Sequence, residues 1–151
     1  MPHDFKKWPE LTNSQMQIYY FESPHKQITN SFEATCTKVT DGDTIRVKTD
    51  FRDFTFPVRF INTAAPELDE PGGPEAKGWL EEQILGKDIY VKINPKERVG
   101  KWGRILGEVF HGGINFNETS IREGWAIPFV QRKEGRFVDL DKLLKFEGFN
   151  F

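Results

Sequence analysis

The fold of this chain is decided by the segment Val58–Glu67, VRFINTAAPE, in which an alternating apolar pattern ends at a proline-containing loop. Two shorter segments, DGDT at Asp41–Thr44 and KWGR at Lys101–Arg104, also place charged side chains at the ends of predicted strands. Together the three segments supply two arginines and several carboxylates. We expect them to converge at the mouth of one small barrel, although they lie far apart along the chain.

Alternation around that segment predicts short strands. The sequence FTFPVRFIN, residues 54–62, places Phe56, Val58 and Phe60 on one face. Pro57 has no N–H to donate to a sheet ladder, which favours an edge strand or a bulge at this point. Similar patterns predict further strands at residues 32–40, 43–49, 87–93 and 104–110.

Three helices are predicted between and after the strands. The first covers residues 74–85, beginning at a proline and ending before Gly86. A short helix is expected within residues 114–124, capped by Asn115 or Asn117, and an amphipathic helix at residues 138–146. Strands too short for a sandwich, together with these helices, predict a mainly β, α+β fold built on a small closed barrel. The first helix would bury Ala76, Leu80 and Ile84.

Asp43 has an unusual predicted position. It shares the strand parity of Ile45 and Val47, so its carboxylate points to the apolar side of the strand. An unpaired charge in such a place is costly. Asp43 therefore needs a cation or several hydrogen-bond donors.

Length and composition predict one compact domain with a single core, since the chain has 151 residues. Cys36 is the single cysteine, which excludes an intrachain disulfide and a thiolate zinc cluster and predicts a buried, inert thiol. No apolar run is long enough to span a bilayer, so no membrane partner is expected. Residues 1–30 lack the pattern of a signal peptide, which favours an intracellular protein.

The net charge of −2 means that any nucleic-acid site must be local. One basic segment, residues 92–104, could supply it, although a solvated loop would have the same composition. Its positive side chains are Lys92, Lys96, Arg98, Lys101 and Arg104.

Residues 1–31 differ from the rest, because they are rich in aromatic and turn residues without strand alternation. We interpret them as an N-terminal extension of a domain that covers residues 32–151. Thr12 and Gln15 form a capping pair for a short helix. The aromatic content predicts that the extension packs on the outside of the domain, with docking to a protein partner as the alternative.

The motifs in chain order resemble the staphylococcal-nuclease-like, or thermonuclease, family. The order is DGDT, then an arginine separated by five residues from APE, then GPEA opening a helix, then KWGR and NETSIREGWA. The resemblance covers roughly residues 33–130. It implies a five-stranded OB-fold barrel with three helices and a calcium-dependent endonuclease that acts on DNA, with RNA as a second candidate substrate.

The resemblance also implies roles for individual residues. Arg59 matches the arginine that binds the scissile phosphate, Glu67 the carboxylate that positions or deprotonates water, and Arg104 the second arginine. Asp43 matches a calcium ligand, and Ala65 stands where the family offers a backbone carbonyl to the metal. The nucleic-acid contacts that the resemblance suggests are Lys101, Trp102 and Phe129.

Ala64 departs from the family pattern, because active members carry an aspartate there as the second carboxylate on the metal. Its loss should weaken calcium binding, since affinity depends on the number of charged ligands. Two explanations compete: a naturally non-catalytic OB-fold module that binds nucleic acid or protein, or a nuclease whose metal ligand was replaced to make it inactive. Retention of Asp43, Arg59, Glu67 and Arg104 favours the second explanation.

Overall fold

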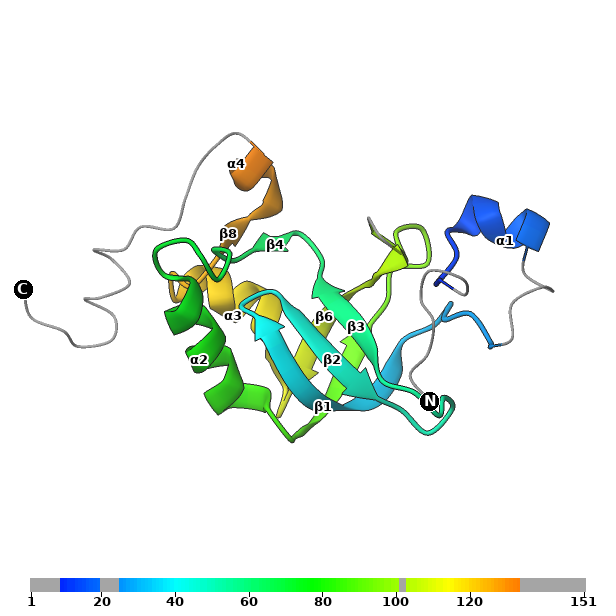
Figure 1. Cartoon of the computed structure of the whole chain (residues 1–151), viewed down its shortest axis with the longest axis horizontal. Coiled ribbons are helices and arrows are strands. Elements are labelled where there is room, and N and C mark those ends of the chain that lie inside the picture. The colour runs from blue at the N-terminus through cyan, green and yellow to red at the C-terminus, as the bar shows by residue number, and fades with distance from the viewer. Residues whose placement is uncertain (1–8, 20–24, 101–102, 134–151) are drawn as a thin grey trace, which may run out of the picture.

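The computed structural model describes residues 9–19, 25–100 and 103–133, in which short strands form a barrel flanked by helices (Figure 1). One sheet has the strand order β3-β2-β1-β5-β6-β7. An additional parallel pairing between β3 and β6 closes this sheet into a barrel, as the sequence predicts. The strands are β1 (Phe32–Asp41), β2 (Thr44–Lys48), β3 (Phe56–Phe60), β5 (Asp88–Lys92), β6 (Ile105–His111) and β7 (Ile114–Asn115).

β3 as a whole has a neighbour on each side, but Pro57 lies in the part of the strand that pairs with β2 only, which agrees with the edge position that a proline favours. β3 pairs with β2 on one side and with β6 on the other. The ladder to β6 begins at Val58, opposite Ile105. Pro57 precedes this ladder and faces Arg46 of β2, so its missing N–H interrupts no bond to β6.

The barrel core follows the predicted alternation. Phe56, Val58 and Phe60 are each at most 1% exposed, whereas Pro57 and Arg59 between them are only partly buried. Cys36 also belongs to this core, as predicted. Burial raises the pKa of its thiol to about 11, which keeps it protonated and unreactive at neutral pH.

Two helices cover one end of the barrel (Figure 1). α2 (Gly73–Ile84) ends just before Gly86 and buries the three predicted side chains, Ala76, Leu80 and Ile84. α3 (Phe116–Arg122) is capped by the Asn115 side chain, which accepts a hydrogen bond from the Glu118 N–H.

Asn117 in α3 joins the helix to the barrel. Its side-chain amide donates to the carbonyls of Ile61 and Gly107, and its oxygen accepts the Val109 N–H. This buried side chain thus forms hydrogen bonds with three backbone groups next to the β3–β6 pairing that closes the barrel. The predicted helix at 138–146 lies outside the described residues.

α1 (Asn13–Tyr19) lies at the opposite end of the barrel from α2 and α3 (Figure 1). The predicted capping pair is present, since Gln15 N–H donates to the Thr12 hydroxyl and Thr12 N–H to the Gln15 side chain. No helix in the described part of the chain is long and apolar enough to cross a membrane.

Candidate nuclease site

Two glycines allow the charged segments to pack together. Gly42 lies in the turn between β1 and β2, and a Cβ there would stand 2.6 Å from the Cβ of Ala65 and 2.9 Å from that of Ala76. Gly73 begins α2, and a Cβ there would overlap the Glu67 carbonyl oxygen. The DGDT turn, the loop after β3 and the first turns of α2 therefore meet at distances that a side chain would not permit.

Asp43 and Arg59 form a partly buried ion pair at this meeting point. Arg59 Nη1 lies 3.0 Å from Asp43 Oδ2, which also accepts the Ala65 N–H at 2.9 Å. Asp43 Oδ1 accepts the hydroxyl of Thr44 at 3.0 Å. Asp43 is 7% exposed, so the burial expected from its strand parity is present, and three protein donors compensate its charge.

Asp41 is a third charged member of the site that the sequence interpretation missed. Its Oδ1 accepts the backbone N–H of Asp43 at 3.0 Å. Burial, followed by the hydrogen bond and charge of Asp43 and by the charge of Glu67, raises the pKa of Asp41 to about 7. The carboxylates of Asp41, Asp43 and Glu67 therefore share one neighbourhood. The signal was the pair of aspartates on either side of Gly42, of which the sequence interpretation gives a role to Asp43 alone.

Glu67 is exposed, and its backbone is fixed by a neighbouring carboxylate. Its N–H donates to Glu70 Oε1 at 2.9 Å, and Arg132 Nη2 lies 2.5 Å from the same oxygen. The hydrogen bond from the Glu67 N–H, and next that from Arg132, lower the pKa of Glu70. These contacts tie the Glu67 loop to α4 (Phe129–Lys133) and leave the Glu67 side chain directed to solvent.

Arg104 directly precedes β6, beside the strand that carries Arg59. Leu106, two residues further on, is the ladder partner of Arg59, so both arginines project from the same side of the barrel wall. The Nε of Arg104 is buried and has no hydrogen-bond partner among the described residues. Within that part of the chain no ion pair joins Arg104 to a carboxylate, so Arg104 precedes the strand next to that of Arg59 without direct contact with the acids.

Of the three suggested nucleic-acid contacts, Lys101 and Trp102 lie outside the described residues. Phe129 lies at the site, with its ring centroid 5.5 Å from Arg59 Cζ. Its backbone N–H donates to the Asn62 carbonyl at 3.0 Å. Phe129 is therefore placed as a packing surface for the Arg59 guanidinium.

Arg98 is not part of a basic surface, which corrects the sequence interpretation. It is 3% exposed, and its guanidinium donates to the carbonyls of Ile28 and Leu11. The charge run 92–104 gave no indication of this burial, because the partners lie about 70 to 90 residues away in sequence.

The sequence matches the family model described as staphylococcal nuclease homologue over residues 57–148, more than half of the chain. The chain belongs to this family. Endonuclease YncB of Bacillus subtilis is 26% identical over 129 residues, covering 80% of this chain and 60% of that protein. Probable endonuclease LCL3 of Komagataella phaffii is 32% identical over 105 residues, covering 62% and 45%.

Ribonuclease TUDOR 1 of Arabidopsis thaliana is 29% identical over 108 residues, which is 61% of this chain and 11% of that protein. The chain thus spans less than two thirds of the length of each of these relatives.

The residues at the family's calcium position determine whether this chain can hold the ion. Ala64 lies in β4 (Thr63–Ala64), pairs with Ile127 of β8 (Ile127–Pro128), and is 4% exposed. Its methyl group supplies no ligand oxygen. Both oxygens of Asp43 already accept bonds from protein donors. No group of three or more His, Cys, Asp or Glu side chains in the described ranges is spaced to hold a metal. The donor set therefore fits a tightly held calcium ion poorly.

Proposed function

We propose that this chain is a domain of the endonuclease type, which acts on phosphodiester bonds within strands of DNA, with RNA as a second substrate, and that Ala64 impairs its cutting. The observation that carries the proposal is the Asp43–Arg59 ion pair, packed beside Asp41 and Glu67 at the barrel mouth. Membership of the nuclease-homologue family and relatives named as endonucleases support it.

The chemistry of phosphodiester hydrolysis explains the residue types. A nucleophile must approach an anion, and the pentavalent transition state gains negative charge. In the proposal, Arg59 binds the scissile phosphate through two parallel N–H donors, and Arg104 stabilises charge on the leaving-group side. Glu67 accepts a proton from the attacking water or positions it, since its carboxylate is exposed at the site.

Substrate binding would change the Asp43–Arg59 pair. Arg59 donates to Asp43 at 3.0 Å, and a phosphate that bound the same guanidinium would compete for this bond. Asp43 keeps the N–H of Ala65 and the hydroxyl of Thr44 as donors, so its charge remains partly compensated after the exchange.

We further propose that the family's calcium would be held by Asp43 and the Ala65 carbonyl, and only weakly, because Ala64 removes one carboxylate ligand. Cutting by the chain as it stands is then weak or undetectable. Calcium in such sites supplies charge neutralisation and lowers the pKa of water.

The test is restoration of the carboxylate. Ala64→Asp should give calcium-dependent cutting of plasmid DNA and of single strands, while Ala64→Asn, which has the same shape without the charge, should not. Adding Arg59→Ala to the Ala64→Asp chain should abolish cutting. Failure of the restored protein to cut in calcium, with calcium binding confirmed by calorimetry, removes the enzyme proposal.

A non-catalytic OB-fold module is the second candidate, and the complete set of donors on Asp43 favours it. Such a module would bind nucleic acid in the presence of a chelator, with an affinity that falls steeply as salt rises. It would also stay inert after Ala64→Asp. The same pair of variants therefore separates the two functions.

A further inference from the structure

The described part of the N-terminal extension is joined to the barrel by a buried cluster of charges. Glu10 is 4% exposed and lies between two guanidiniums, those of Arg52 and Arg98. Its Oε2 accepts the Ile28 N–H at 2.7 Å. Burial raises the pKa of Glu10, but the hydrogen bond with His25 and the charge of Arg52 outweigh this effect and leave the pKa below its ordinary value.

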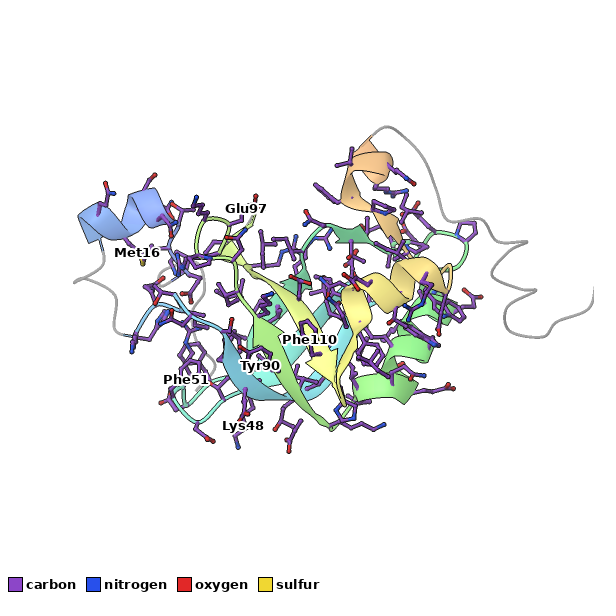
Figure 2. All side chains as sticks on the ribbon, turned by 180° about the vertical axis from the view of Figure 1, so that it is seen from behind. Met16, Lys48, Phe51, Tyr90, Glu97 and Phe110 are labelled. Carbon is purple, nitrogen blue, oxygen red and sulfur yellow. The ribbon has the colours of Figure 1, made fainter. Side chains whose placement is uncertain are left out.

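Arg98 links this cluster to the loop that precedes β6. Its Nη1 donates to the Leu11 carbonyl at 3.0 Å and to Asn13 Oδ1 at 3.1 Å, while Nε donates to the Ile28 carbonyl at 2.6 Å. Asn13 also donates from its Nδ2 to the Pro95 carbonyl at 2.9 Å. Figure 2 shows the result, with α1, marked by Met16, beside the loop marked by Glu97.

The extension also touches the residue just before Arg104. Gly103 has φ +69°, and a Cβ there would lie 3.2 Å from the Cβ of Pro9 and 3.3 Å from the Glu10 carbonyl oxygen. The turn is closed on its other side, because Gly100 N–H donates to the Arg104 carbonyl at 2.8 Å. The backbone that carries Arg104 is thus held between β6 and residues 9–10.

We propose that the segment Pro9–Asn13 is a brace that positions Arg104 to bind a nucleic-acid phosphate, with Asn13 and Arg98 as positioning residues. Arg104 is only partly buried, and its Nε has no hydrogen-bond partner among the described residues, so a shift of the side chain toward a phosphate would break no bond at Nε. Misplacement of a binding group by about 1 Å can lower a reaction rate by two orders of magnitude. A contact that fixes the backbone of Arg104 can therefore affect how well the site works. This inference rests on the proposed function, because it assumes that the site binds nucleic acid.

Asn13 allows the brace to be tested without disturbing the core, since its side chain is exposed. Asn13→Ala removes the contacts with Pro95 and Arg98 together. Asn13→Asp is the conservative variant, because it keeps an oxygen for Arg98 and loses the donor to Pro95. Ser14→Ala, at the next exposed position of α1, is the matched control.

The assay is binding of a fluorescein-labelled single-stranded DNA decamer to the full chain in chelator, measured by fluorescence anisotropy. Loss of the charged donors in Arg104→Ala should weaken binding about tenfold or more. Asn13→Ala should weaken it about threefold to fivefold, as expected for two lost hydrogen bonds that act indirectly. Asn13→Asp should fall between, and Ser14→Ala should bind like the parent.

The double variant Asn13→Ala with Arg104→Ala is the deciding measurement. If Asn13 acts through Arg104, the double variant binds no more weakly than Arg104→Ala alone. Gly103→Ala, which forces the turn away from Pro9, should reproduce the Arg104→Ala loss while circular dichroism shows an intact fold. The brace is wrong if Asn13→Ala weakens DNA binding equally with and without Arg104, or does not weaken it at all. The proposed function would still stand in either case. A parent-like Arg104→Ala overturns the brace and the role given to Arg104 together.

Discussion

Glu10 should be one of the largest single contributors to stability outside the barrel core. Glu10→Gln removes the negative charge that lies between the buried guanidiniums of Arg52 and Arg98. The Glu10 side chain is 4% exposed and those of both arginines 2%, so water cannot replace the lost partner. We therefore expect a strongly destabilised protein that still folds, since glutamine keeps the shape and one acceptor oxygen.

The magnitude follows from this burial. Breaking a buried ion pair by removing one partner costs about 3 to 5 kcal/mol, and the retained acceptor places Glu10→Gln near about 3 kcal/mol. For a chain of this length that corresponds to a fall in Tm of about 6 to 12 °C. Glu97→Gln, exposed on the loop beside α1, should change stability by less than about 0.5 kcal/mol and serves as the control.

The pH dependence gives a second check. The pKa of Glu10 is below its ordinary value of 4.5 in the folded state, so its stabilising effect is present above pH 4.5 and is lost as pH falls through the folded pKa. Urea unfolding followed by tryptophan fluorescence should show a parent-to-variant difference that is large at pH 7 and shrinks on acidification. A difference below about 1 kcal/mol at pH 7, or one that does not change with pH, would refute the reasoning.

Three further predictions concern the site and its support. Gly42→Ala should lower the free energy of unfolding by about 1 to 3 kcal/mol, measured by calorimetry, because its Cβ would lie 2.6 Å from a neighbouring Cβ. Gly78→Ala, which has open space around it in α2, should instead raise the free energy of unfolding in the same measurement. Asn117→Ala should cost about 2 to 4 kcal/mol in urea unfolding, since it leaves the Val109 N–H without its partner and removes one of two bonds from the Ile61 and Gly107 carbonyls. Asp41→Asn should stabilise more at pH 8 than at pH 5: a raised carboxyl pKa of about 7 means that the parent loses stability as pH rises toward 7. A thermal-shift gain that is the same at both pH values would contradict the last prediction.

Local pattern was sufficient for the five longer strands, the main helix and the burial of Asp43. Alternation of Phe56, Val58 and Phe60 defines one face of β3 whatever its neighbours are, because side chains of a strand alternate with period two. The same parity placed Asp43 on the buried side of its strand. A predicted helix with buried residues at i, i+4 and i+8 became α2.

The sequence reasoning could not identify contacts between residues that are distant along the chain. The pattern around Pro57 did not reveal the parallel β3–β6 ladder, which starts one residue later and joins segments almost fifty residues apart. Asp41 received no role of its own because Glu67 comes near it only after the chain has folded. The short pairing of β4 with β8, beside Ala64, has no signal in either segment alone.

The sequence by itself determined that this is a small barrel with arginines and carboxylates at strand ends, because periodicity and turn residues act within a few positions. Only the tertiary structure decided which charges meet: Arg59 lies against Asp43 at the candidate site, and Arg98 lies against Glu10 beneath the extension. Both arginines look alike in sequence. They differ because a buried guanidinium needs specific acceptors, and folding alone determines where those acceptors lie.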